Sequence, residues 1–410
     1  MRLTRRQALA LSAAVPALAG PRRKSVAFIF TEYRRNAHAD VIGTRLLEGY
    51  EYYGKRADPR VEVVSMHAEQ FPKNDMARAM AAKHRVPMYD SIREALTRGG
   101  SSLAVDGVII VGEHGDYPHN EKGQHMYPRY DLFKSVVDVF ESSGRAVPVF
   151  CDKHLSYDWT KAKWMYDQSR RLKFPMLAGS SLPLAWRHPA LEIPYGTKFR
   201  RAVSVGYGDN DAYGFHALET LQCMVERRAG GETGVRAVQA FAGAEAWRWT
   251  EANPWARTLL DAALAKSETR KAGRVEDLAK KPLIIALEYV DGFEAAMFML
   301  NGVTSDFLFA AEIRAGKSEP AASHFRLQSG RFFGHFSGLV HFAEELVIKG
   351  KEPYPVERTL LTTGVLAAGL DSAFQGGKRL ETPHLAIRYA PARRDYYNRG
   401  PVPVGEAEAL

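Results

Sequence analysis

The sequence predicts an α/β fold in which a doubly wound parallel sheet is followed by an α+β domain with a mostly antiparallel sheet. In residues 25–182, short apolar runs alternate with segments of helical spacing, which is typical of βαβ units and a parallel sheet. In residues 183–390, apolar runs are separated by loops more often than by helices, which is typical of an antiparallel sheet. At 410 residues the chain is also long enough for two cores.

Five apolar runs are the expected main strands of the first domain, and they are residues 26–30, 61–64, 105–111, 147–151 and 175–179. Apolar residues recur at helical spacing between them, which predicts helices over residues 41–53, 76–84, 91–96, 130–142 and 160–172. Because parallel strands end at one edge of a sheet, the polar residues that follow these runs are expected to gather there.

The second domain is expected to contain strands over residues 199–205, 235–241, 283–290, 295–300 and 307–313. Asp291-Gly292 lies between two of them and is typical of a hairpin turn. Helices are predicted over residues 212–227, 336–348 and 356–374.

The N-terminus has the order of an export signal. Thr4-Arg5-Arg6-Gln7 precedes an apolar run from Ala8 to Ala19, and Ala17-Leu18-Ala19 is a small-residue cleavage site. This predicts a twin-arginine signal over residues 1–20 and a bacterial protein that is periplasmic or secreted. The run is too short for a stable membrane anchor. The alternative is a basic N-terminus with no targeting function.

The net charge of +9 does not indicate a nucleic-acid partner. Six basic residues and no acid fall within residues 1–24, so the rest of the chain carries only +3. A protein that binds a phosphate backbone usually carries more positive charge. The two cysteines, Cys151 and Cys223, are expected to be buried thiols, and the sequence leaves open whether they pair.

Lys153 follows the run at 147–151, in Asp152-Lys153-His154, which puts its amine at the sheet edge where ligands bind. The segment resembles the Glu-Lys-Pro strand end of the Gfo/Idh/MocA family of sugar-type oxidoreductases. Trp186-Arg187-His188-Pro189 resembles the family's crossover, and residues 211–219 resemble its Asp-x-Gly-x-His helix start. The resemblance implies a Rossmann-like nucleotide-binding domain over residues 25–182, a substrate and dimerisation domain over 183–390, and an extended tail over 391–410.

The resemblance also implies a catalytic set. His216 corresponds to the family's general acid/base on the sugar hydroxyl, and histidine suits this role because its pKa lies near working pH. Lys153 would orient that hydroxyl. Asp211 would be the acidic partner of His216, but it lies five residues upstream instead of four, so it is alternatively the N-cap of the helix. The competing interpretation of His216 is a buried histidine between the domains.

NAD or NADP is the cofactor that the resemblance implies, but the first loop, residues 31–40, contains no glycine. Glycines normally let the backbone approach the pyrophosphate at the helix start. We therefore expect either that the cofactor binds in an altered way, through Arg34 and Arg35 of this loop, or that it has been lost. The expected cofactor-binding residues are Thr31, Arg34, Arg35, Glu69, Glu113, His114 and Asp152.

The loop from Gly112 to His125 is rich in histidines and acids. A divalent metal is an alternative cofactor, and its expected ligands are Glu113, His114, His119 and His154. Their spacing matches no standard metal signature, so the other interpretation is a polar loop that recognises substrate. Trp247, Trp249 and Trp255 are candidates for stacking on sugar rings, or for core packing.

Three functions follow from these observations. The leading one is an exported, NAD(P)-dependent oxidoreductase that acts on a hydroxyl of a sugar or polyol. The alternative is a non-redox lyase, isomerase or hydrolase of carbohydrates that depends on a metal or on acid/base residues. The second alternative is a sugar-binding protein without catalysis. The expected partner is a small carbohydrate-like molecule, and the resemblance implies a homo-oligomer formed through the second domain's sheet.

Overall fold

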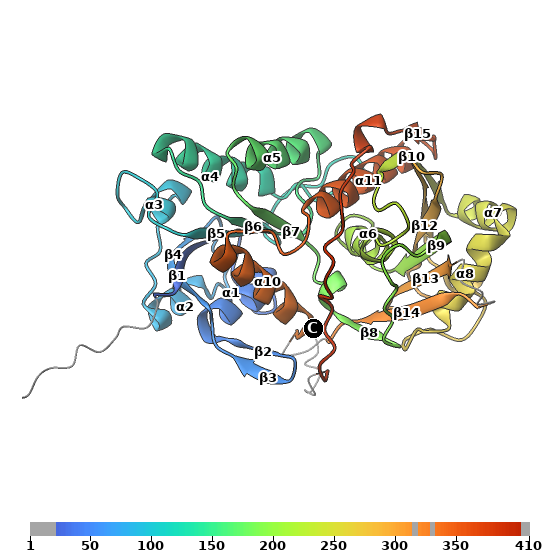
Figure 1. Ribbon diagram of the computed structural model, residues 1–410, viewed down its shortest axis with the longest axis horizontal. Coiled ribbons are helices and arrows are strands. Elements are labelled where there is room, and N and C mark those ends of the chain that lie inside the picture. Colours follow the sequence, from blue (N-terminus) through green and yellow to red (C-terminus); the bar gives the residue numbers. More distant parts are fainter. Residues whose placement is uncertain (1–21, 314–318, 329–332, 403–410) are drawn as a thin grey trace, which may run out of the picture.

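Two sheets organise the computed structural model, which describes residues 22–313, 319–328 and 333–402 (Figure 1). The predicted export signal lies outside the described residues, as does the end of the predicted tail from residue 403. Within the described ranges, no helix is long and apolar enough to cross a membrane. Cys151 and Cys223 are both buried and unpaired.

The first sheet confirms the predicted doubly wound parallel domain. Its strands run in the order β4 (Val61–Ala68), β1 (Lys24–Phe30), β5 (Gly107–Val111), β6 (Val149–Asp152) and β7 (Met176–Gly179), and all neighbours are parallel. A parallel bridge from Met66 to Met88 adds a further position beyond β4. The strand order reverses between β1 and β5, and this is where such sheets bind ligands.

Five helices flank this sheet: α1 (His38–Glu48), α2 (Ala77–His84), α3 (Ile92–Thr97), α4 (Arg129–Ser143) and α5 (Trp159–Arg171). The predicted helix over residues 41–53 is too long. It ends at Glu48 because Gly49 adopts a positive φ of 80°. A hairpin of β2 (Tyr50–Tyr52) and β3 (Lys55–Ala57) follows.

The second sheet confirms the predicted mostly antiparallel domain. Its eight strands are β15 (Leu380–Glu381), β10 (Val235–Ala242), β11 (Leu283–Tyr289), β12 (Glu294–Met299), β9 (Phe199–Gly206), β13 (Phe307–Ile313), β14 (Ala321–Arg326) and β8 (Trp186–His188), in that order. Only β12 and β9 pair in parallel. Strands β8, β14 and β15 were not predicted, because each is short or lies outside the long apolar runs.

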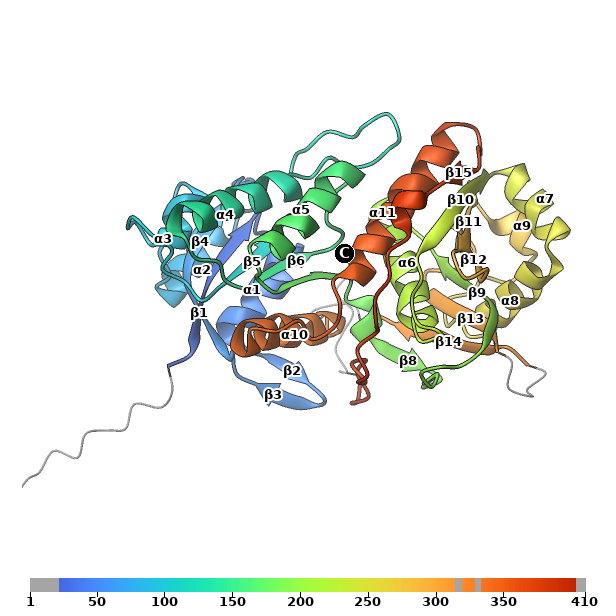
Figure 2. The same cartoon turned by 45° about the horizontal axis from the view of Figure 1, so that its top comes forward.

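Helices of this chain cover both faces of the second sheet (Figure 2). One face packs against α6 (Ala212–Val225) and α11 (Glu357–Phe374). The other packs against α7 (Ala244–Ala252), α8 (Pro254–Leu264) and α9 (Val275–Leu278), which were not predicted. A homo-oligomer formed through this sheet, as the sequence analysis expects, stays a prediction.

The three tryptophans pack on this second face. The Trp249 ring stacks on Phe241 with centroids 5.5 Å apart, and its edge meets Trp255 at 5.9 Å. Trp247 is a partly buried member of the same cluster. Their position supports core packing rather than contact with a sugar.

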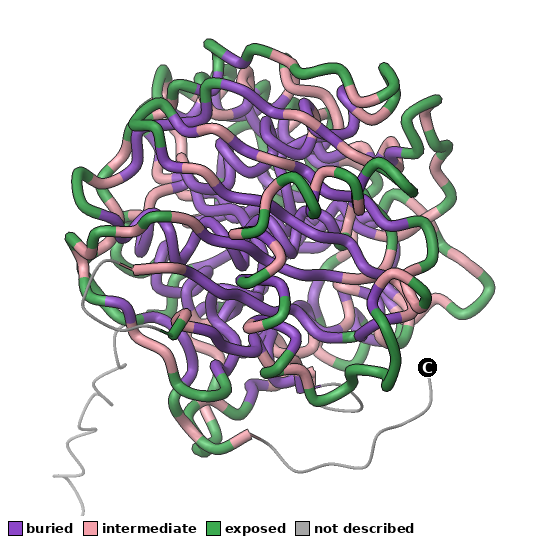
Figure 3. The backbone as a smooth tube through the Cα atoms, turned by 90° about the vertical axis from the view of Figure 1, so that its right-hand side faces the viewer, coloured by how far each residue is buried: buried purple, intermediate pink, exposed green. Residues whose placement is uncertain are grey.

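Helix α10 (His335–Lys349) returns from the second domain to the first and packs beside α1 (Figure 1). Leu339 and Phe342 join the same core as Phe28 of β1. Its buried Glu344 accepts hydrogen bonds from the Tyr50 hydroxyl at 2.6 Å and from the amide of Arg60 at 2.7 Å. The first domain thus contains a helix from the C-terminal part of the sequence. Buried residues lie throughout the centre of the molecule (Figure 3).

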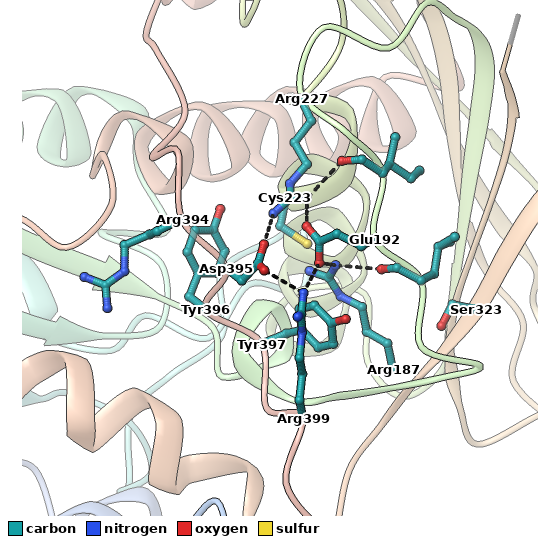
Figure 4. Close-up of polar contacts among 12 residues, drawn as sticks. Arg187, Glu192, Cys223, Arg227, Ser323, Arg394, Asp395, Tyr396, Tyr397 and Arg399 are labelled. Atoms are coloured by element: carbon teal, nitrogen blue, oxygen red, sulfur yellow. Dashed lines mark hydrogen bonds and ion pairs between the residues drawn. The ribbon is translucent and has the colours of Figure 1, made fainter. Parts of the chain in front are cut away.

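The C-terminal segment is fastened to the crossover between the domains by a charged cluster (Figure 4). Arg399 contacts Asp395 at 2.6 Å and Glu192 at 3.2 Å. Arg227 contacts the same two carboxylates. The Arg187 guanidinium lies 4.2 Å from the centre of the Tyr397 ring. The described part of the predicted tail therefore packs on the crossover, and it also contacts the first domain, where the Tyr53 hydroxyl donates to the Tyr397 carbonyl at 3.1 Å.

We predict that Leu260→Ala weakens the fold without changing the oligomeric state. Leu260 is fully buried between α8 and the second sheet, and truncating such a side chain costs about 2–5 kcal/mol. Denaturant unfolding measures the loss, and light scattering measures the mass. The exposed Thr258→Ala on the same helix is the control. Unchanged stability together with a smaller mass would show instead that α8 is a subunit interface.

Candidate functional site

A cavity of about 680 Å³ lies between the two domains. The first domain contributes residues that follow its strand ends, namely Asn36, His38, Glu113, His114 and Lys153. The second domain contributes His216, the aromatic side chains of Tyr207, Tyr213 and Phe307, and a polar group that includes Asp306, His324 and Arg326. Aromatic and polar side chains on facing walls suit a ligand with an apolar ring face and several hydroxyls.

Lys153 lies at the turn that ends β6. Its φ is 69°, a left-handed conformation that costs a non-glycine residue about 1–3 kcal/mol. Two backbone hydrogen bonds with Gly179, of 3.2 and 3.1 Å, hold this turn. The buried ammonium lies 2.7 Å from His216 Nε2 and 3.5 Å from Glu113 Oε1. The structure therefore brings Lys153 and His216 together.

The contacts of His216 define its tautomer. An ammonium can only donate, so Nε2 accepts from Lys153. The proton of the neutral ring is then on Nδ1, which donates to the Ser180 hydroxyl at 2.6 Å. Burial, and then the Lys153 charge, hold the pKa of His216 well below its usual value. His216 is a neutral base whose single in-plane lone pair, on Nε2, accepts the hydrogen bond from the Lys153 amine.

Glu113 neutralises the buried cations. Burial alone would raise the pKa of Glu113, but Lys153 and Arg129 outweigh burial and hold it well below its usual value. Arg129 Nη2 donates to the Glu113 carboxylate, and its Nη1 donates to His154 Nε2 at 3.3 Å. Both Arg129 and Glu113 are buried. The Lys153 charge thus has a fixed counter-charge at the adjacent strand end.

Asp211 does not meet His216, and the predicted partnership is wrong. The carboxylate of Asp211 accepts the amide of His125 at 3.0 Å and lies 3.9 Å from His154 Nε2. Asp211 does occupy the N-cap position of α6, but the capping carboxylate is that of Asp209, which accepts the amide of Ala212 at 2.6 Å. Burial raises the pKa of Asp211 to about 6.

The start of α1 does not form the usual phosphate cradle. Backbone amides at a helix start bind phosphate only when they are free. Here the amide of Asn36 donates to Asp40 at 2.9 Å, that of Ala37 to the Arg34 carbonyl at 3.0 Å, and that of His38 to His114 Nδ1 at 3.4 Å. At residues 36–38 a dinucleotide would therefore meet amides that are already hydrogen-bonded within the chain.

Of the predicted cofactor residues, Thr31, Glu113, His114 and Asp152 lie at the same sheet edge, whereas Glu69 lies apart from them. Thr31 donates to the Glu113 carbonyl at 2.8 Å, and Arg34 pairs with Glu32 at 2.5 Å. Arg35 and Glu69 are exposed, and Glu69 borders a separate hollow of about 910 Å³ beside β4 and α2. Asp152 faces His38, while His114 lines the cavity.

The four residues of the alternative metal site do not gather. His119 stacks on His125 with ring centres 4.2 Å apart. The His154 ring lies between Arg129 and Asp211, and Glu113 is held by its two cations. Among the residues that the structure describes, no group of three or more His, Cys, Asp or Glu side chains could hold a metal ion.

Sequence reasoning missed three members of the site. Ser180 directly follows β7, so the strand-end rule that found Lys153 would have found it. His38 was read only as part of a phosphate loop. Arg129 is the first residue of α4 and belongs to no motif that the sequence analysis recognises.

No family model and no curated protein sequence matches this chain. Solved structures match its fold across 88% of its length. GenD2 from gentamicin A biosynthesis, in complex with NAD, is 14% identical to this chain. The match covers 97% of the GenD2 chain and has a TM-score of 0.55. Scyllo-inositol dehydrogenase from Lactobacillus casei is 10% identical, is covered to 98% and has a TM-score of 0.54. Myo-inositol 2-dehydrogenase from Lactobacillus plantarum is 12% identical, is covered to 99% and has a TM-score of 0.50.

The chain therefore has the two-domain fold of Gfo/Idh/MocA-type inositol and sugar dehydrogenases, as the sequence predicted. At these identities the likeness shows the fold alone. One fold carries many functions, so the chemistry of this chain depends on the side chains of its cavity.

We predict that Asp211→Asn stabilises the protein above about pH 6 but not near pH 4. Because the folded-state pKa is raised from 3.8 to about 6, the favourable protonated form is lost as the pH rises through this window. Asparagine keeps an acceptor for the His125 amide, so the gain is about 1–3 kcal/mol at neutral pH. Urea unfolding at several pH values measures it, with the exposed Asp138→Asn as control. Equal stability of Asp211→Asn and wild type at neutral pH would contradict the prediction.

Proposed function

We propose that this chain is an oxidoreductase that acts on a hydroxyl group of a sugar or polyol. The observation that carries the proposal is the 2.7 Å contact between the Lys153 amine and the neutral Nε2 of His216 in the interdomain cavity. A substrate hydroxyl that enters between them receives a hydrogen bond from Lys153 and gives its proton to His216. The fold shared with inositol dehydrogenases supports this substrate class.

NAD or NADP is the hydride acceptor that we propose, with support from the NAD-bound GenD2 structure. A nicotinamide ring, when bound, supplies the site that accepts hydride from the substrate carbon. The first turn of α1 offers its phosphates no free amide at residues 36–38, so binding would depend on side chains such as Arg34 and Arg35.

A second candidate function is favoured by the same internally bonded amides. It is a non-redox lyase, isomerase or hydrolase in which Lys153 and His216 move protons on a carbohydrate without a dinucleotide. The two candidates share the substrate class and the catalytic pair, and they differ in the need for a hydride acceptor.

Calorimetric titration with NAD and NADP, together with turnover of myo-inositol, scyllo-inositol and glucose, tests the proposal. We expect dinucleotide binding and NADH or NADPH formation. Lys153→Ala and His216→Ala should each lower kcat by about 10²–10⁴-fold, because each removes a proton-transfer partner. The control is Lys134→Ala, an exposed lysine paired with Asp138. Turnover without a dinucleotide would establish the second candidate, and unchanged kcat in both variants would refute the catalytic pair.

We propose as well that the protein is exported through its twin-arginine signal. The support is the order of Arg5-Arg6, the apolar run and the cleavage site in the sequence. A double variant, Arg5→Lys with Arg6→Lys, should leave the precursor in the cytoplasm of a bacterial host. Cell fractionation measures this, with Arg22→Lys as control. Periplasmic accumulation of the double variant would contradict the proposal.

A further inference from the structure

His38 and Asp152 form a pair at the start of α1. The Nδ1 of His38 lies 2.5 Å from Asp152 Oδ2, and Asp152 is buried. These residues come from different parts of the chain: His38 is the first residue of α1, and Asp152 is the last residue of β6. The side chain of His38 is 14% exposed and lines the same cavity as Lys153 and His216.

The ring of His38 is held in one orientation by its neighbours. The Phe336 ring of α10 meets it edge-on with centres 4.8 Å apart, and the His114 ring lies 5.2 Å away. Because Asp152 is a carboxylate and accepts, the Nδ1 of His38 carries the shared proton. The other ring nitrogen, Nε2, is then the one available to a ligand in the cavity.

His38 lies among other titratable groups, and Asp152 is the carboxylate that it contacts. Burial lowers the pKa of His114 to about 3, so His114 is neutral and its Nδ1 accepts the His38 amide. Burial likewise lowers the pKa of His335 on α10 to about 3. Asp152 is the carboxylate in direct contact with His38, while Glu113 is engaged by Lys153 and Arg129.

We propose that His38, oriented by Asp152, is a second acid/base residue of this site and contacts the substrate directly. The inference rests on the proposed binding of a hydroxylated substrate in the cavity. In the step, Nε2 takes the proton of a substrate hydroxyl: the O–H bond breaks, an N–H bond forms, and the electron pair stays on oxygen. Asp152 remains ionised and stabilises the imidazolium, as a carboxylate does behind a catalytic histidine.

Two variants separate this role from a structural one. His38→Asn keeps a donor toward Asp152 and removes Nε2. Asp152→Asn offers an amide in place of the carboxylate and favours the other tautomer of His38. His384→Asn, an exposed histidine away from the cavity, is the control.

We expect His38→Asn to lower kcat by about 10²-fold or more on whichever of myo-inositol, scyllo-inositol and glucose the wild type turns over, while KM and the melting temperature change little. Nitrogen-15 NMR of labelled histidine should show the His38 proton on Nδ1 in wild type and on Nε2 in Asp152→Asn. A His38→Asn enzyme that retains wild-type kcat overturns the proposal, and so does a wild-type proton on Nε2.

Chemical modification separates this proposal from the proposed function. Diethyl pyrocarbonate acylates accessible neutral imidazole nitrogens, so peptide mapping should find His38 modified in wild type, with exposed His384 as the positive control. If wild type turns over none of the sugars, the proposed function fails, while modification of His38 still shows an accessible Nε2. An unmodified His38 beside a modified His384 overturns the inference.

Discussion

The buried ammonium of Lys153 is the constraint on which the site depends. A charge removed from water must be paired and hydrogen-bonded, or folding becomes unfavourable. Glu113 comes from the neighbouring strand end and His216 from a helix of the other domain, and both meet this amine. The contact that positions the base is therefore also a contact between the two domains.

The same requirement extends behind the cavity. Glu113 is shared with Arg129, Arg129 donates to His154, and His154 lies 3.9 Å from Asp211, so these buried polar groups form one continuous line. An arginine does not release its proton in proteins, so this line cannot carry protons from Asp211 to Lys153. Proton transfer is confined to the groups that line the cavity, and the groups behind Arg129 fix the position of Glu113.

The sequence predicted the parts of the site that obey a local rule. Lys153 follows an apolar strand, and parallel strands end together, so its place at the sheet edge could be foreseen. The role of Asp211 could not, because a one-residue offset at a helix start turns the carboxylate toward His125, and Asp209 takes the cap. Helix α10 comes late in the sequence and packs in the core of the first domain. No local pattern encodes that contact.

The start of α1 contains no glycine, and side chains of this chain lie where a phosphate would approach. Glycine is needed there when a phosphate must approach the backbone closely. In this chain the position is taken by its own groups: Asp40 and His114 accept the amides, His38 turns toward Asp152, and Phe336 of α10 packs on the His38 ring. With no close approach at residues 36–38, Cβ atoms are tolerated. Side chains therefore fill the start of α1, and His38, the first residue of this helix, lines the cavity.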